Sequence, residues 1–270
     1  EREFQVRAEL SRERRRKLLI NQVPVKTGAE LSRVYNTVFF CPEDLHLIRE
    51  GAAARRKFLD TALCQLRPRY AQALAQYHRT YEHKTRILRD SEDKPGLLET
   101  LPEFNERLVR YGAVLIHYRH QFSLRLREYA ALNHRECSGE REELEIQYAT
   151  VSTVTDPGAD LSVLMNQLRA HMESHREAER ASRLCLSGPH KDDLLVTIDG
   201  RDAKQYASQG QTRTAALSMK LAEREIYKNV VGEYPVLLLD DVLSELDPRR
   251  QEFVLNRIAG GQVFITCCED

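Results

Sequence analysis

The stretch "PVLLLDD" at 235–241 limits the possible folds of this 270-residue chain more than any other feature. An unbroken apolar run of strand length is typical of a strand buried on both faces, as in a parallel sheet. Asp247-Pro248 then predicts the capped start of a helix, and Gly260-Gly261 predicts its end. The apolar run "QVFIT" follows as the next strand. Strand, helix and strand in this order predict a right-handed crossover, and therefore an α/β fold with an at least partly parallel sheet.

Two acids, Asp240 and Asp241, come directly after the first of these strands. Ligands of open α/β sheets bind beyond the carboxyl ends of the strands. Adjacent carboxylates behind buried aliphatic residues are costly to desolvate unless they bind a metal ion or activate a water molecule. We therefore expect an Mg²⁺ ligand here, next to a residue that positions a nucleophilic water. A structural role, in which one acid only caps the following turn, is the alternative.

A second polar stretch, "YASQGQTRT" (206–214), stands just before a segment of helical periodicity. The apolar face of that helix is formed by Ala215, Met219, Ala222, Ile226 and Val230. Because this face anchors the helix, its free N-terminal amides and positive dipole end are expected to face an anion. Gly210 would let the backbone approach closely, and the Ser208 hydroxyl could donate to a phosphate. The alternative is an ordinary loop before a helix.

The rest of the chain divides into regions by its pattern. Residues 1 to about 50 alternate like a small β region, with a hairpin expected at Asn21-Gln22. The pattern then becomes helical, and β character returns with the apolar run at 193–200. We therefore expect 1–50 and 185–270 to form one lobe, and 51–184 to form a second, helical lobe.

The helical region predicts an antiparallel hairpin on either side of "DSEDKPG" (90–96). The apolar seam of its second helix comprises Phe104, Leu108, Tyr111, Leu115, Tyr118, Phe122, Leu126 and Tyr129. Thr100 to Glu103 resembles a capping box at the start of that helix. The hairpin is either a projecting arm or part of an ordinary bundle, and its short seams favour the bundle. A further helix is expected from Leu161 to about Arg183.

Considered together, the polar motifs resemble those of a known family. "SQGQTR" (208–213) and "LLLDDVLSELD" (237–247) resemble the signature and Walker B motifs of ABC-type ATPases. With "GPHKDD" (188–193), their wording resembles the RecF family of DNA replication and repair proteins, and "PEDLHLIREGAAARRKFLD" (42–60) resembles the segment that leads into the family's helical lobe. The resemblance spans most of the chain. It implies an ABC-type ATPase head, with a mixed or parallel sheet, helices and a large inserted helical lobe.

The resemblance also implies a role for the residues before the helix at 215–230. In this family the signature turn faces an ATP molecule held by a second copy of the protein. The residues expected to bind that ATP are Ser208, Gly210, Gln211 and Arg213, with Gln211 and Arg213 either adding contacts to the nucleotide or holding the loop. His190, in the "GPHKDD" turn, is expected either to contact the nucleotide or only to bind backbone.

For the acids, the resemblance implies that Asp240 holds Mg²⁺ and that Asp241 replaces the catalytic glutamate of many ABC ATPases. Aspartate is shorter than glutamate, which fits a slow hydrolysis used as a switch. Ser244 and Asp247 match the D-loop, which crosses the dimer interface, although Asp247 is also expected to cap the helix that follows it.

The function implied is an ATP-dependent clamp on DNA in recombinational repair and replication-fork maintenance. ATP would drive two heads to dimerise around double-stranded DNA near a junction with single-stranded DNA, and slow hydrolysis would release it. The resemblance suggests RecR, and through it RecO, as partners, and a cytoplasmic, nucleoid-associated protein. One alternative is a chromosome-organising ATPase like SMC proteins, for which the helical region is too short. The other is a non-enzymatic helical scaffold, which leaves the two acids and "SQGQTR" unexplained.

Net charge gives no support for nucleic-acid binding, because 41 basic residues balance 41 acidic ones. The candidates for DNA contact are therefore local, and the run Arg55-Arg56-Lys57 is the one we select. A solvated helix face is the more ordinary explanation of such a run. No apolar run reaches the roughly 18 residues that a membrane span needs.

The chain departs from the family pattern at two places. It contains no G-x-x-x-x-G-K-[ST] phosphate loop, which the family places near its N-terminus, ahead of where this chain begins. We therefore expect a piece of a longer protein that alone binds ATP poorly and hardly hydrolyses it. The position of the family's switch histidine holds Cys267-Cys268, so no switch residue is assigned. The six cysteines show no framework spacing, which predicts reduced thiols.

Overall fold

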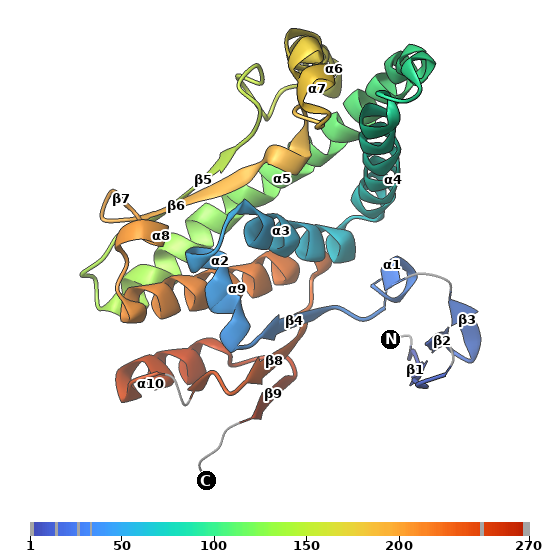
Figure 1. The fold of residues 1–270 in the computed structure, drawn as a ribbon. Helices are drawn as coiled ribbons and strands as arrows, with labels where there is room; N and C mark the ends of the chain where they lie inside the picture. Colours follow the sequence, from blue (N-terminus) through green and yellow to red (C-terminus); the bar gives the residue numbers. More distant parts are fainter. Residues whose placement is uncertain (1–2, 14–15, 26–27, 33, 244–245, 267–270) are drawn as a thin grey trace.

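The computed structural model describes residues 3–13, 16–25, 28–32, 34–243 and 246–266, and every statement below concerns these residues. Within them, three sheets of three strands each are assembled around long helices (Figure 1). The longest helix, α5 (Leu101–Ser138), runs diagonally through the molecule, and α9 (Gln209–Val231) packs along it. These two helices connect the parallel sheet on one side with the helical region on the other.

The strand–helix–strand unit predicted at the end of the chain is confirmed. Strand β8 (Val236–Asp240) is followed by α10 (Pro248–Arg257) and by β9 (Val263–Thr266). Strand β4 (Thr37–Phe40) lies on the other side of β8. Both β4 and β9 run parallel to β8. Because all three strands point the same way, the polar residues that follow them gather at one edge of the sheet.

The expectation that β8 is buried on both faces is wrong. Leu237 and Leu239 are 1% and 2% exposed, and they point into the core, on the face of the sheet that packs on α9. The alternate residues form a row across the sheet, in which Leu238 pairs with Phe39 and Phe264. Phe39 is 47% exposed and Phe264 is 53% exposed. The apolar run therefore predicted the strand correctly but not its burial. Apolar side chains on a strand do not show which other elements cover them.

Helix α9 is buried around much of its circumference. The predicted apolar face is confirmed for Ala215, Met219, Ala222 and Ile226, which are at most 1% exposed. The opposite sides carry charged residues that are also buried, with Lys220 and Glu223 paired at 2.7 Å. A helix enclosed in this way is held firmly by its packing from Thr212 onward.

The helical region contains the expected reversal of the chain. Helices α3 (Ala52–Leu66) and α4 (Pro68–Asp90) lead to the 3-10 helix η2 (Pro95–Thr100), after which α5 returns along α4. The capping box expected at Thr100 is wrong, because this residue is itself helical and its hydroxyl donates to the Leu97 carbonyl at 2.7 Å. Here α5 continues directly from η2, so the first turn of α5 needs no side-chain cap.

The seam predicted for α5 lies in the core, except for Phe104, which is half-buried outside it. Its buried members are Leu108, Leu115, Phe122 and Leu126, and Tyr111, Tyr118 and Tyr129 pack against them. Past the region shared with α4, the same helix packs on α9 and on a second sheet. The hairpin itself packs on α3 and α6, as in a bundle, and lies away from the parallel sheet (Figure 1). The proposed boundaries at 50 and 185 stay a prediction.

The second sheet is antiparallel and joins two distant parts of the chain. It consists of β5 (Leu144–Ala149), β6 (Asp193–Ile198) and β7 (Arg201–Asp202), in that order. The strand at 193–198 was expected, whereas its partner β5 was not. The single helix expected from Leu161 is instead two, α6 (Leu161–Ser174) and α7 (Arg176–Ser182). The break at His175 brings Glu179 within 2.5 Å of the buried Lys84 ammonium.

The N-terminal sheet lies at one side of the molecule in Figure 1 and comprises β1 (Val6–Glu9), β2 (Lys17–Ile20) and β3 (Val23–Val25). The predicted hairpin is confirmed, since Asn21 and Gln22 join β2 to β3 with φ angles of 48° and 68°. Two positive φ angles in a two-residue turn suit the twist of antiparallel strands. The short helices are α1 (Gly28–Leu31), η1 (Pro42–Leu45), α2 (His46–Arg49), η3 (Pro189–Lys191) and α8 (Ala203–Tyr206).

Cys41, Cys64, Cys137 and Cys185 are free thiols, as expected, and Cys267 and Cys268 lie outside the described residues. In the part of the chain that the structure describes, the helices are all too short or too polar to cross a membrane.

Candidate nucleotide-binding site

The two acids lie at the carboxyl edge of the parallel sheet, where Thr266 of the neighbouring strand holds them in place. The Thr266 hydroxyl donates to Asp240 Oδ1 at 2.5 Å. The Asp241 amide donates to the Thr266 carbonyl at 3.2 Å and to its hydroxyl oxygen at 3.0 Å. Asp241 has a φ of 52°, so the chain turns away from the sheet directly at this residue. Sequence reasoning missed Thr266, whose role depends on the pairing of β8 with β9.

Neither acid is buried, which corrects the desolvation argument made from the sequence. Asp240 is exposed and Asp241 is half-buried, because β8 ends at the rim of the sheet. Both residues therefore keep contact with solvent. A role for them follows from their position and not from a penalty of burial.

The residues present fit an Mg²⁺ ion held jointly with a nucleotide. Among the described residues, no group of three or more His, Cys, Asp or Glu side chains is placed to hold a metal ion. Mg²⁺ commonly takes only one or two carboxylates from a protein and completes its shell with water and phosphate oxygens. The Asp240 carboxylate meets that requirement, because it is exposed and the hydrogen bond from the Thr266 hydroxyl to its Oδ1 orients it.

The signature turn, residues 208–213, is shaped by a capping box at the start of α9. Ser208 Oγ accepts from the Gln211 amide at 3.2 Å, and Gln211 Oε1 accepts from the Ser208 amide at 2.9 Å. Sequence reasoning missed this box, although its residue types stand at the right spacing. Because Ser208 Oγ acts as an acceptor here, its own hydrogen remains available as a donor. Of the two roles considered for Gln211, the structure shows that it holds the turn.

Gly210 has open space around it within the described chain. A Cβ atom placed on it would meet nothing closer than 4.0 Å, at Ser208 Oγ and Arg250 Nη2. Glycine in a helix is less favourable than alanine by about 1 kcal/mol. The packing of this chain therefore gives no reason for glycine at this position, and the free space is where a ligand or a second copy can approach.

One residue of the signature turn lies near one of the two acids in the folded chain. Arg213, in the first turns of α9, lines the same small cavity as Asp241, and Val242 and Leu246 also belong to its lining. Residues that stand far apart in the sequence thus share one surface region.

Asp247 is the N-cap of α10, as predicted. Its Oδ1 accepts from the Arg250 amide at 3.1 Å, and its carboxylate forms an ion pair with the Arg250 guanidinium. These contacts, the amide first, hold the pKa of Asp247 below its ordinary value. Ser244, the other residue assigned to the D-loop, lies outside the described residues.

The run Arg55-Arg56-Lys57 is not a basic surface, and the choice of Arg55 as a DNA contact is corrected. Arg55 is 6% exposed, and its guanidinium binds both carboxylate oxygens of Asp193, at 2.7 and 2.9 Å. Arg56 is half-buried and donates to the Asp192 carbonyl at 2.7 Å. Only Lys57 is exposed. Three consecutive residues of a helix point in different directions, so adjacent cations need not share a face.

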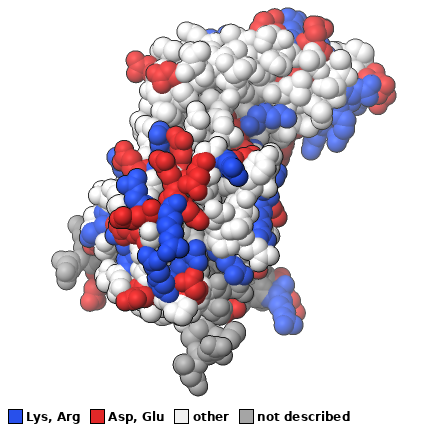
Figure 2. All heavy atoms as spheres, turned by 90° about the vertical axis from the view of Figure 1, so that its left-hand side faces the viewer, with Lys and Arg blue, Asp and Glu red and all other residues white. Residues whose placement is uncertain are grey.

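Charges of both signs are mixed on the face of the molecule shown in Figure 2. Lysine and arginine side chains alternate there with aspartate and glutamate side chains, and no continuous basic surface is visible among the described residues of that face. This view agrees with the balanced composition of the chain.

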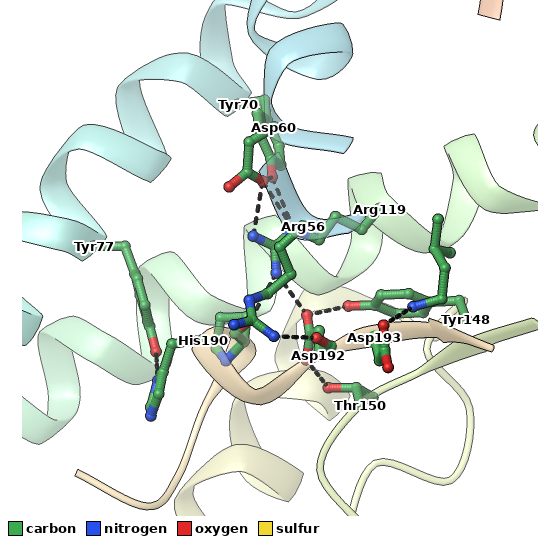
Figure 3. A network of polar contacts seen from close by, with 12 residues as sticks. Arg56, Asp60, Tyr70, Tyr77, Arg119, Tyr148, Thr150, His190, Asp192 and Asp193 are labelled. Atoms are coloured by element: carbon green, nitrogen blue, oxygen red, sulfur yellow. Dashed lines mark hydrogen bonds and ion pairs between the residues drawn. The ribbon is translucent and has the colours of Figure 1, made fainter. Parts of the chain in front are cut away.

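His190 is bound within the protein through both ring nitrogens, and Figure 3 shows its contact with Tyr77. Nε2 lies 3.0 Å from the Cys185 carbonyl, which can only accept, so Nε2 carries the hydrogen. Nδ1 then accepts from the Tyr77 hydroxyl at 2.7 Å. Of the two roles considered, the structure shows the backbone contact, and a nucleotide contact stays a prediction.

The environment of His190 gives a testable pH dependence. Burial, which disfavours the charged ring, lowers the pKa of His190 from 6.5 to about 4. Between these values the unfolded chain binds more protons, so the stability that the neutral ring contributes is complete above pH 6.5 and is lost as the pH falls. We expect the free energy of unfolding to fall by up to about 1.4 kcal/mol per pH unit from this group. Urea unfolding of the wild type and His190→Gln at pH 7, 6 and 5 measures the difference. Equal slopes for the two proteins would contradict it.

Asp192, two residues after His190, is the centre of a buried polar network (Figure 3). Its carboxylate accepts from Arg119 at 2.8 Å, from Thr150 at 2.6 Å and from the Tyr148 hydroxyl. Burial raises the pKa of Asp192, and the Arg119 guanidinium is the largest opposing influence. Sequence reasoning missed this network. Its signal in the sequence was the pair Asp192-Asp193 at the end of "GPHKDD".

Arg119 connects this network to two further elements. Its Nη1 also donates to the Pro189 carbonyl at 2.7 Å, and its Nη2 lies 2.8 Å from Asp60 Oδ1. Asp60 in turn accepts from the Tyr70 hydroxyl. The buried guanidinium of α5 is therefore bonded to α3 and to the segment before β6, which fixes these parts relative to one another (Figure 3).

A parallel sheet with acids at its carboxyl edge, long helices and the exposed start of a buried helix define a mixed α/β ATPase head. No protein-family model matches the chain. It is 38% identical over 269 residues to the DNA replication and repair protein RecF of Agathobacter rectalis, covering 99% of this chain and 71% of that protein. RecF of Alkaliphilus oremlandii is 37% identical over 261 residues, covering 97% and 70%.

A solved structure described as the recombination mediator protein RecF-ATPrS in the RecFOR pathway matches at a TM-score of 0.89 and 32% identity, covering 98% of this chain and 71% of that one. A second, RecF-ATP, matches at a TM-score of 0.88 and 32% identity, covering 98% and 70%. The chain belongs to the RecF family of DNA replication and repair proteins.

Proposed function

We propose that this chain is part of an ATP-dependent clamp on DNA in recombinational repair and replication-fork maintenance. ATP bound between two copies drives them to dimerise around double-stranded DNA near a single-stranded gap, and slow hydrolysis releases the DNA. The observation that carries the proposal is the open signature turn, where Ser208 and Gly210 face free space at the start of a firmly held helix. It is supported by the similarity to the RecF structures described with ATP and ATPrS.

In this mechanism the signature turn binds the terminal phosphate of an ATP held by the second copy. The first amides of α9 and its positive dipole end attract the phosphate, and the Ser208 hydroxyl hydrogen donates to it. Gly210 lets the nucleotide approach the backbone, and Arg213 adds positive charge nearby. Gln211 acts indirectly, because its side chain holds the Ser208 amide.

The acids act on the nucleotide bound by this same copy. Asp240 would hold Mg²⁺, which neutralises the charge that develops on the phosphates during phosphoryl transfer. Asp241 orients the attacking water, and its half-buried position at the edge of the sheet keeps it in contact with solvent. Ser244 and Asp247 are proposed to lie at the dimer interface.

The DNA surface, the partners and the cellular place of the clamp are also proposals. Lys57 is the exposed member of the basic run and so remains a candidate DNA contact, with Arg56 beside it. RecR, and RecO through it, are proposed partners because similar structures are described within the RecFOR pathway. We propose that the protein acts in the cytoplasm, on the nucleoid.

The proposal is tested by measuring ATP-dependent dimerisation and DNA binding of the full-length protein, phosphate loop included. Light scattering with and without ATP gives the oligomeric state, and binding to gapped and to blunt duplex DNA gives the preference. A dimer that forms only with ATP and prefers gapped DNA supports the clamp. A protein that stays monomeric with ATP contradicts it and favours a scaffold.

Asp241→Asn is expected to lower the rate of ATP hydrolysis by about 100-fold or more while ATP-dependent dimerisation remains. Asparagine keeps the size of the side chain and tolerates the positive φ of 52°, so the backbone is preserved while the charge that orients the water is removed. Phosphate release under single-turnover conditions measures the rate, and light scattering measures the dimer. If this variant hydrolyses ATP at the wild-type rate, Asp241 is not the catalytic acid.

A further inference from the structure

Arg250 connects the signature turn to the cap of α10. Its Nε donates to Thr214 Oγ1 at 2.9 Å, and its Nη1 forms an ion pair with the Asp247 carboxylate. Its amide also donates to Asp247 at 3.1 Å. The Arg250 side chain is 27% exposed, so most of it is covered by the protein.

The connection reaches the backbone of the signature turn itself. Thr214 Oγ1 donates to the Gly210 carbonyl at 2.9 Å while it accepts from Arg250. Arg250 Nη2 lies 4.0 Å from the position that a Cβ on Gly210 would take. A continuous set of polar contacts thus runs from Asp247 through Arg250 and Thr214 to Gly210.

Helix α10 also packs on a third element, α5. Arg257 lies 3.7 Å from Glu136 near the end of α5. The Arg249 guanidinium lies against Gly139. A Cβ atom added to Gly139 would be only 2.2 Å from Arg249 Nη2. Because Val254 of α10 is fully buried and the helix packs on α5, Arg250 has a defined position from which to hold the signature turn.

We propose that Arg250 is a positioning residue that sets the signature turn and Asp247 in one geometry for the nucleotide held by the second copy. This inference rests on the function proposed above. The planar guanidinium bonds two acceptors at a fixed angle, which a lysine ammonium does not do. Without Arg250, the two helix starts lose their common bond, and dimerisation must order them at a cost in affinity.

The test uses the full-length protein with Arg250→Met, Arg250→Lys and Thr214→Val. Arg249→Met is the matched control, because this neighbouring arginine of the same helix packs on Gly139 and not on the signature turn. Three quantities are measured: the dissociation constant of the ATP-bound dimer, the affinity of the monomer for a fluorescent ATP analogue, and the melting temperature of the ATP-free monomer.

We expect Arg250→Met to weaken the ATP-bound dimer about tenfold or more, while monomer affinity for ATP changes less than about twofold. Arg250→Lys should fail to rescue the dimer, and Thr214→Val should weaken it without adding to the effect of Arg250→Met. Arg249→Met should leave the dimer unchanged.

The outcomes separate this inference from the proposed function. If the wild type does not dimerise with ATP, both fall. If the wild type dimerises and Arg250→Met dimerises equally well, only the inference falls. If Arg250→Met lowers the melting temperature and the dimer is restored at a temperature where the monomer is folded, the role of Arg250 is structural, and the inference also falls.

Discussion

Ser208→Arg in the full-length protein is expected to abolish ATP-driven dimerisation, with a loss of affinity between the two copies of at least about 100-fold. Ser208 is exposed at the start of α9, and its hydroxyl is the donor proposed for the terminal phosphate. An arginine side chain fills the free space beside Gly210 that the nucleotide needs. It also cannot accept from the Gln211 amide, so the capping box is lost.

Loss of the cap alone lowers stability by about 1 kcal/mol, which must be separated from the effect on the dimer. Asp202→Ala is the control, since Asp202 caps the short helix α8 by accepting from the Lys204 amide at 2.8 Å. Ser208→Thr, which keeps a hydroxyl and a cap, should still dimerise. Sedimentation equilibrium with ATP measures the association constant. A Ser208→Arg protein that dimerises like the wild type would show that the signature turn does not meet a second copy.

Arg119→Met is expected to lower the free energy of unfolding by about 3–5 kcal/mol, because it leaves buried charges without their partner. Asp192 is buried and Asp60 is largely so, and Arg119 is the cation that both share. The Pro189 carbonyl also loses its donor. Urea unfolding at neutral pH, followed by circular dichroism, gives the change.

A control on the same helix is available for this prediction. Arg127 forms an ion pair with Glu145 at 3.2 Å, but its side chain is 55% exposed. Arg127→Met should therefore change stability by less than about 1 kcal/mol. Combining Arg119→Met with Asp192→Asn should cost less than the sum of the two single changes, since the second removes the charge that the first leaves unpaired. Equal effects of Arg119→Met and Arg127→Met would refute the role given to the network.

The elements that could be predicted from the sequence are those specified by neighbouring residues. The crossover β8–α10–β9 follows from two apolar runs, a capping Asp247 and a pair of glycines, all within one short segment. The hairpin at Asn21-Gln22 is equally local. In such segments the residue types that favour a turn or a cap stand beside the element they end.

The features that could not be predicted depend on residues far apart in the chain. Strand β5 forms because β6 pairs with it, and the spacing of its residues does not identify that partner. Arg55 stands in a run that is typical of a solvated surface, yet Asp193 pairs with it in the core. Thr266 and Arg250 likewise gain their roles only when β9 and α10 are placed. For the candidate site, the sequence therefore supplied the acids and the signature turn but not the residues that hold them.

The left-handed backbone at Asp241 restricts which residues evolution can try at that position. Asparagine, aspartate and glycine visit positive φ angles readily, whereas longer and branched side chains do so only under strain. Of these three, aspartate alone carries a negative charge. A lineage that required a carboxylate on this turn would thus retain aspartate. The short side chain of the acid is then a consequence of the positive φ angle of the backbone.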